Sequence, residues 1–211
     1  MNEFLGLYPA WLEPGIGAGW VIGFIATIHV LFSHASVGAA LVFAWLARRA
    51  VTANQPQHLD FIRKYGAFLL IFSYVLGSVT GPGIWFAATI ANPRGISALI
   101  HNFVWLWATE WVFFLIEVAG VYLLVYLAGR VPIKTYLRYC TIFALSSVGT
   151  LLIIVGILSF MLWPGQDSWY QTGGVLSAFF GESMFAQLSA RFFFMLTILS
   201  LIHISEPTRP Y

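Results

Sequence analysis

The sequence predicts an all-α protein: a polytopic transmembrane helix bundle of four full helices and a truncated fifth, with the N-terminus outside. Composition, long apolar runs and the placement of Lys and Arg support this prediction. Of the 211 residues, 60% are hydrophobic and 9% are charged, and the mean hydropathy is +0.84. Soluble domains are usually about 25% charged. Much of this chain must therefore face membrane lipid.

The apolar runs give the predicted helices. Four runs cover residues 19–47, 65–91, 101–128 and 137–162, and a fifth begins near residue 185. Each full run exceeds the roughly 20 residues that cross a bilayer as a helix. Barrel strands would be about ten residues long and alternating in polarity. The runs therefore predict helices, and no soluble domain is expected between them.

Basic residues alternate between the connections and predict the orientation. The stretch before the first run has no Lys or Arg, and the connection after the second run has only Arg94. The connections after the first and third runs hold seven: Arg48, Arg49, Arg63, Lys64, Arg130, Lys134 and Arg138. Lys and Arg accumulate on the cytoplasmic side, so we expect the N-terminus on the opposite side. Because these residues lie in connections, the net charge of +2 gives no reason to expect nucleic-acid binding.

The last residues change character abruptly. Residues 199–211, LSLIHISEPTRPY, resemble a translated sequencing adapter. We therefore expect residues 1–198 to be the N-terminal part of a longer membrane domain and residues 199–211 to be a non-native tail. The alternative is an ordinary polar tail.

Five ionisable residues lie in or at the ends of the apolar runs, and they are the candidates for chemistry: His29, His34, His101, Glu110 and Glu117. A charge at the bilayer centre costs about 2.5 to 3.5 kcal/mol even on the lenient insertion scale. Such residues are tolerated where they face the bundle interior, a partner or a cofactor.

His29 lies on a stripe of small and mildly polar residues. With the helical spacing i, i+3, i+4, it shares one face with Ala26, Ser33, Ser36 and Ala40. Small residues beside an imidazole leave room for a bulky, flat group. The alternative is close packing of helices through the small residues. His34 follows five residues later, about 140° around the helix, so the two imidazoles are predicted to face different sites.

Glu110 and Glu117 are seven residues apart, nearly two turns, so both carboxylates share one helix face about 10 Å apart. A carboxylate ladder suits a proton path, and a carboxylate can also ligate iron. The alternative is structural hydrogen bonding between helices. Because His101 opens the third run, its simplest expected role is at a helix start near the outer surface.

The stretch GSVTGPG, residues 77–83, lies in the outer half of the second run. Pro82 removes one backbone hydrogen bond, and Gly77 and Gly81 allow close approach. Counting along the runs places this stretch at the depth of His29 and Glu110, about 15 Å below the outer boundary. We expect it to form the wall of a cofactor pocket.

Three segments in this order, IATIHVLFSHASVG, KYGAFLLIFSYVLGSVTGPGIWF and WATEWVFFLIEVAGVYLLVY, resemble subunit I of the cytochrome bd quinol oxidases. The resemblance is closer to the bd-like membrane cytochromes and covers roughly residues 15–130. It implies a protein of the bacterial inner membrane, with its N-terminus periplasmic or extracellular. It also implies haem of the b type or the d type, quinol as the electron donor, and a second membrane subunit or a c-type cytochrome as partner.

The resemblance also implies roles for individual residues. His29 matches the first-helix histidine that ligates haem iron, and Glu110 and Glu117 match two glutamates of haem ligation and proton delivery. Gly77, Thr80 and Gly81 match the glycine turn of the second helix. His34 is an additional histidine relative to the oxidases, and His34 and His101 are candidates for further haem ligands. The chain departs from the oxidases in its fifth run, where residues 185–198 contain no histidine.

Four functions therefore remain open, the last of them a scaffold subunit whose intramembrane polar residues only hold the helices together. The first is a haem-binding electron-transfer subunit that resembles the quinol-oxidising, oxygen-reducing subunit. The second is a quinol-linked electron-transfer subunit without oxygen chemistry. The third is a proton-coupled transporter without haem, in which His29, Glu110 and Glu117 form the relay.

Overall fold

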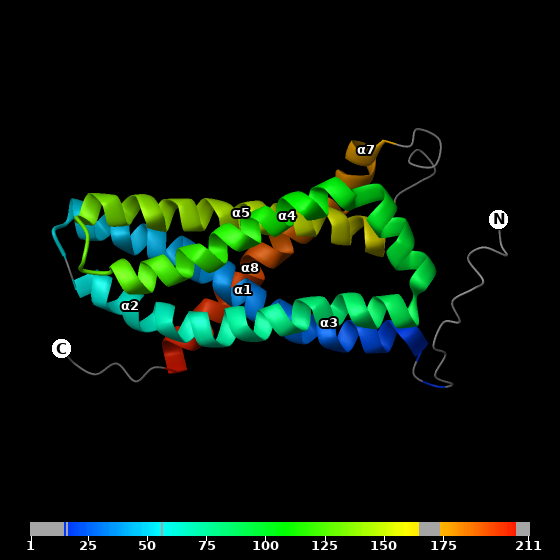
Figure 1. Cartoon of the computed structure of the whole chain (residues 1–211), viewed down its shortest axis with the longest axis horizontal. Coiled ribbons are helices and arrows are strands. Elements are labelled where there is room, and N and C mark those ends of the chain that lie inside the picture. Colours follow the sequence, from blue (N-terminus) through cyan, green and yellow to red (C-terminus); the bar gives the residue numbers. More distant parts are fainter. Residues whose placement is uncertain (1–14, 16, 56, 165–173, 206–211) are drawn as a thin grey trace.

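A computed structural model describes residues 15, 17–55, 57–164 and 174–205 (Figure 1). Within these residues the chain is helical and contains no strand. The helices are α1 (Gly17–Thr52), α2 (Gln57–Leu69), the π-helical η2 (Leu70–Val75), α3 (Leu76–Ala91), α4 (Pro93–Leu127), α5 (Ile133–Leu162), α7 (Val175–Phe179) and α8 (Met184–Ser205). The predicted all-α class is confirmed.

Four rods are long and apolar enough to cross a membrane. They are α1, the continuous rod α2–η2–α3, α4 and α5. The described apolar part of α8 is shorter, Met184–Ser200. Some helices begin several residues before the predicted apolar runs, because polar residues form their first turns. Thus α2 starts at Gln57, because an amphipathic turn that carries Asp60 and Arg63 leads into the second run.

Helix α1 lies at the centre of the bundle and packs against α3, α5 and α8 (Figure 1). Helix α4 packs mainly on α5, and α3 packs mainly on α1. By contrast, α3 and α4 contact each other little, although only Asn92 separates them in the sequence. The bundle therefore consists of two antiparallel pairs, α1–α3 and α4–α5, joined through α1 and α5.

The start of α4 differs from the prediction. His101 was expected to open this helix, but the helix begins at Pro93, eight residues earlier. Asn92 caps it by accepting a hydrogen bond from the Gly95 backbone N–H at 3.1 Å, and proline suits the first helical position. Phe103 has non-helical angles (φ −122°, ψ 17°), which bend the helix two residues after His101.

Helices α4 and α5 approach each other closely at glycines. A Cβ atom at Gly120 would lie 3.0 Å from the Phe143 ring, and one at Gly149 would lie 3.2 Å from the Phe113 ring. Small residues of this kind allow helices to pack tightly in membranes. Close to the end of α4 and the start of α5, the Tyr136 hydroxyl donates to the Leu124 carbonyl at 3.0 Å. These contacts hold α4 and α5 together as one unit.

Helices α3 and α4 carry large apolar side chains that the described chain does not cover. Trp105 is 82% exposed, Phe86 71% and Val79 69%. Only small fractions of α3 and α4 are buried, whereas about half of the apolar window of α1 and of α5 is buried. Exposed apolar surface of this extent is typical of helices that face lipid.

The predicted tail at residues 199–211 is only partly described. Helix α8 continues without a break from Met184 to Ser205, so residue 199 does not mark a helix end. Residues 206–211 lie outside the described part of the chain. The non-native origin of this segment stays a prediction.

Tyr136→Phe is expected to lower the free energy of unfolding by about 1 kcal/mol, because it removes a buried hydrogen bond to the Leu124 carbonyl. Unfolding in mixed detergent micelles would measure it. Tyr139→Phe is the matched control, since Tyr139 lies on the same helix and is only half-buried. Equal effects of the two substitutions would contradict the assigned role of the Tyr136 hydroxyl.

Candidate functional site

His29 is held between α1 and α3 by Thr80. Its Nδ1 atom lies 2.9 Å from the Thr80 Oγ1 atom, and Thr80 Oγ1 donates to the Leu76 carbonyl at 2.8 Å. A hydroxyl has only one hydrogen to donate. Thr80 must therefore accept from His29, which places the ring hydrogen on Nδ1. The lone pair then lies on Nε2, and the His29 ring also makes a hydrogen bond with the Gly77 backbone.

Small residues of α3 lie against this imidazole. A Cβ atom at Gly81 would lie 3.4 Å from the His29 Cε1 atom, so glycine allows α3 to approach the ring. A Cβ atom at Gly77 would have open space around it within 4 Å. The structure thus brings His29, Thr80 and Gly81 together. Gly77 lies one turn away and leaves room beside the ring.

His34 faces a different neighbour, as the 140° separation predicts. Its Nδ1–H donates to the Val30 carbonyl at 2.8 Å, and its ring meets Phe194 of α8 edge-on at 5.4 Å between centroids. The side chain is 3% exposed, and its Nε2 atom has no hydrogen-bond partner in the described part of the chain. Since a carbonyl can only accept, the Nδ1 hydrogen again leaves the lone pair on Nε2.

Glu117 is the centre of a buried hydrogen-bond cluster. It accepts from the Tyr74 hydroxyl at 3.1 Å and from the Thr150 hydroxyl, and it is 3% exposed. The hydroxyl groups of Ser36 and Ser147 lie beside Tyr74. The cluster joins the π-helical segment, α4 and α5, and it borders α1. Both carboxylate oxygens of Glu117 are therefore satisfied by other helices.

Glu110 has a different environment on the same helix. It is half-buried, and no hydrogen bond or ion pair to it is found among the described residues. Its carboxylate is therefore free to meet a cofactor, a proton donor or water. The two glutamates share one face of α4, as predicted, but only Glu117 is packed into the bundle.

Helix register places Glu110 at the level of His29. Glu117 contacts Tyr74, which fixes the antiparallel alignment of α4 with the rod η2–α3. Glu110 lies seven residues before Glu117 on α4. Gly81 lies seven residues after Tyr74 on the rod η2–α3, and it packs against His29. Both steps cover about 10 Å in the same direction. No hydrogen bond joins His29 to Glu110. About one turn farther along each helix, the Trp85 ring of α3 meets the Trp107 ring of α4 edge-on, with 3.6 Å between their centroids.

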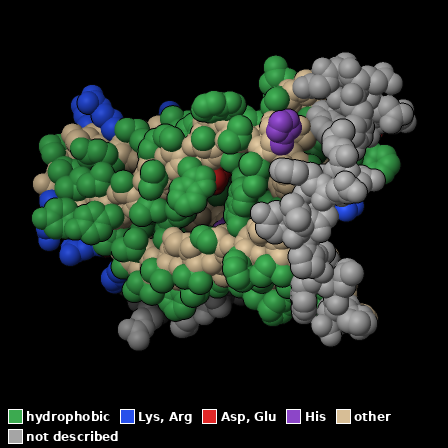
Figure 2. Space-filling view, turned by 45° about the vertical axis from the view of Figure 1, so that its right-hand side comes forward, with side chains coloured by type: hydrophobic (Ala, Val, Ile, Leu, Met, Phe, Trp, Pro, Cys, Tyr) green, Lys and Arg blue, Asp and Glu red, His purple; other side chains and the backbone are tan. Residues whose placement is uncertain are grey.

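An acidic group is recessed in the surface of the molecule. Figure 2 shows acidic atoms at the bottom of a hollow that hydrophobic side chains surround on the visible face. An acidic group in such a setting is shielded from bulk water, which strengthens its interactions with any charge or dipole nearby.

His101 lies apart from the other candidates. It is exposed on the first part of α4, two residues before the bend at Phe103. No interaction of its ring with another described residue is found. Its predicted contact with a cofactor stays a prediction.

The described residues hold no group of three or more His, Cys, Asp or Glu side chains that could bind a metal ion by themselves. A haem needs less from the protein, because its ring supplies the equatorial ligands and the protein supplies axial ones. His29 fits an axial role: its Nδ1–H is donated to an oxygen acceptor, which is typical of metal-binding histidines, and its lone pair lies on Nε2.

Sequence reasoning missed two residues of the site. Tyr74 and Thr150 hold Glu117, but each is one hydroxyl within an apolar run. Their spacing along the chain gives no indication of the contact, because it forms between different helices. The π-helical turn that carries Tyr74 was also missed. The run around it continues without a proline or a charge that would mark it.

Comparison of the chain with models of known protein families, with curated proteins and with solved structures finds no significant match.

Glu117→Ala is expected to lower the free energy of unfolding by about 2 kcal/mol or more, because it leaves the buried Tyr74 hydroxyl without its acceptor. Glu110→Ala is the matched control on the same helix face. Because Glu110 has no partner to lose, its change should stay within about 0.5 kcal/mol. Unfolding in mixed micelles would measure both. A larger loss for Glu110→Ala would mean that Glu110, and not Glu117, ties the helices together.

Proposed function

We propose that this chain is a haem-binding electron-transfer subunit of a membrane, with the His29 Nε2 atom as an axial ligand of haem iron. The observation that supports this proposal is the Thr80–His29 hydrogen bond, which directs the lone pair to Nε2 and fixes the ring. Haem bound at this position supplies one-electron redox chemistry. Gly77 and Gly81 keep side chains away from the ring on the α3 side.

The two glutamates have separate tasks in this proposal. Glu117 keeps the helix register through Tyr74 and Thr150, while Glu110 stands at the depth of His29 with a free carboxylate. With haem bound nearby, such a carboxylate would take up or release a proton, or would help to hold the haem iron. Ser147 lies beside both Glu117 and Tyr74, and Ser36 lies beside Tyr74. In this proposal the hydroxyl groups of this cluster would pass a proton to or from Glu117.

Quinol as electron donor and a second membrane subunit or c-type cytochrome as partner belong to the same proposal. They rest on the resemblance to the cytochrome bd quinol oxidases. The uncovered apolar faces of α3 and α4 are compatible with such a subunit, and lipid can cover them equally well. Oxygen consumption with a quinol donor would separate an oxidase from an electron-transfer subunit without oxygen chemistry.

Reduced-minus-oxidised absorbance spectra of membranes that contain the protein test haem binding. His29→Ala is expected to abolish or shift the haem bands, and Thr80→Val to lower haem retention roughly tenfold, because the orienting acceptor is lost. His58→Ala is the control, since His58 is half-buried at the start of α2 and its ring is hydrogen-bonded to Gln55. Absence of haem bands in well-expressed protein would refute the proposal, and unchanged bands in His29→Ala would remove His29 from it.

We also propose that the chain lies in a bacterial inner membrane with its N-terminus outside. Most Lys and Arg side chains gather at one end of the molecule (Figure 2), where α1 and α4 end and α2 and α5 begin. By the positive-inside rule this end is cytoplasmic. The end that carries Arg94 is then periplasmic or extracellular.

Cysteine labelling in intact cells tests this orientation. Native Cys140 is buried and should react little. Arg94→Cys is expected to react with a membrane-impermeant maleimide in intact cells, whereas Arg138→Cys should react only after the cells are opened. The reverse pattern would invert the proposed topology.

A proton-coupled transporter without haem is the second candidate, and one observation favours it. The π-helical turn η2 carries Tyr74 directly to the buried Glu117, and π-helical turns inside α-helices are frequent at functional sites. Broken helices beside a carboxylate are also typical of transporters. Protein without haem absorbance that moves protons in vesicles would establish this candidate.

A further inference from the structure

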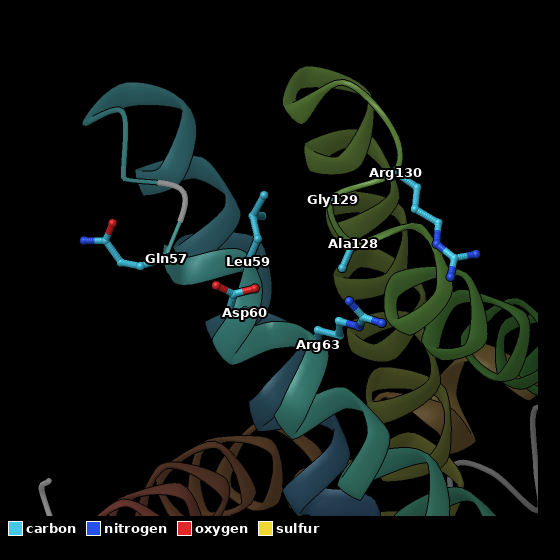
Figure 3. A pocket seen from close by; sticks show the side chains of 7 residues that line it. All are labelled: Gln57, Leu59, Asp60, Arg63, Ala128, Gly129 and Arg130. Atoms are coloured by element: carbon cyan, nitrogen blue, oxygen red, sulfur yellow. The ribbon is translucent and has the colours of Figure 1, made fainter. Parts of the chain in front are cut away.

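A pocket opens at the basic end of the molecule, far along the helices from His29. It has a volume of about 550 Å³ and lies between the start of α2 and the connection from α4 to α5 (Figure 3). Its polar lining comes from Gln57, Asp60 and Arg63 on α2 and from Gly129 and Arg130 on the connection. In Figure 3, the Arg63 side chain extends toward the connection at Ala128.

The lining has an excess of positive charge. The lining holds two guanidinium groups and one carboxylate, and no salt bridge to Arg63 or Arg130 is found among the described residues. In Figure 3 the Arg130 side chain is directed away from Asp60, on the far side of the connection. Arg130 lies over the Tyr126 ring at 4.2 Å from its centroid, a cation–π contact that limits where its side chain can move. Both arginines are exposed. The pocket can therefore accept an anion from the membrane surface without breaking an existing ion pair.

The residues around the pocket are typical of a membrane–water boundary. On the last turns of α4, just before Arg130 in the chain, the rings of Tyr126 and Tyr122 are stacked with 6.1 Å between their centroids, and both side chains are at least half exposed. At the same end of the bundle, Arg49 lies over the Trp45 ring at 5.1 Å. Aromatic rings beneath basic side chains mark the level of lipid headgroups. The exposed tyrosines provide an apolar track for an acyl chain that leads from the pocket toward the bilayer.

We propose that this pocket binds the phosphate headgroup of an anionic phospholipid such as phosphatidylglycerol. Arg63 holds the phosphate oxygens inside the pocket, Arg130 adds a second positive charge at the rim above Tyr126, and the acyl chain follows Tyr126 and Tyr122 along α4. Basic pockets between membrane helices on the cytoplasmic side suit such headgroups. The site does not depend on haem or on the proposed redox function.

Native mass spectrometry of the detergent-purified protein, titrated with phosphatidylglycerol and with phosphatidylcholine, tests the site. Each basic residue near the surface contributes about 1 kcal/mol, or roughly a fivefold change in affinity. Arg63→Gln with Arg130→Gln is therefore expected to weaken phosphatidylglycerol binding by roughly twenty- to thirtyfold. Asp60→Asn should strengthen it, because a repelling charge is removed. Phosphatidylcholine should bind weakly to every variant.

Arg138→Gln is the matched control, since Arg138 lies at the same end of the bundle but does not line the pocket. It should change the affinity less than twofold. An equal loss in this control, or no loss in the double variant, would overturn the proposal in favour of diffuse attraction to the basic end. Displacement of the lipid by equimolar inorganic phosphate would also overturn it, because the site would then select the free anion.

Discussion

Lipid offers no hydrogen bonds, so every polar group within the membrane must find its partner inside the protein. Glu117 is where this constraint acts most strongly, because a carboxyl group with 3% exposure lies among apolar helices. Its partners Tyr74 and Thr150 come from two other rods. Any sliding of α4 along its neighbours would separate a buried carboxyl group from both donors. The hydrogen bonds of Glu117 therefore set the register in which the rest of the bundle is assembled.

The candidate site follows from that register. With Tyr74 opposite Glu117, the next two turns of each rod bring Gly81 and Glu110 to the same depth, and Gly81 lies against His29. Helix α3 packs mainly on α1 and α4 packs mainly on α5, and the Trp85 and Trp107 rings join α3 to α4 about one turn beyond this depth. Glu117 thus holds the helices together, and Glu110 is left without a hydrogen-bond partner among the described residues.

The two histidines of α1 show how a helix can give similar imidazoles different tasks. Both donate from Nδ1, His29 to a threonine of another helix and His34 to a carbonyl one turn back in its own helix. His34 is then enclosed beside Phe194, whereas His29 is only half-buried between α1 and α3. A large ligand could reach Nε2 of His29 with less rearrangement of the helices. This difference in access, more than a difference in chemistry, favours His29 for cofactor binding.

The sequence predicts the spans well and their contacts poorly, for physical reasons. Long runs without charge are a local property, so the four spanning rods and the shorter fifth helix could be predicted from composition. The first residue of a helix is harder to predict, because it depends on one or two capping residues. The Asn92 cap and Pro93 start α4 earlier than the predicted start at His101. The spacing of Glu110 and Glu117 predicted a shared face, but their unequal burial depends on Tyr74 and Thr150, which are distant in sequence. A pairing between helices leaves no periodicity in either helix. For this reason the intramembrane polar residues of such a chain can be identified from the sequence. Whether each of them stabilises the fold or takes part in chemistry can be decided only from the three-dimensional structure.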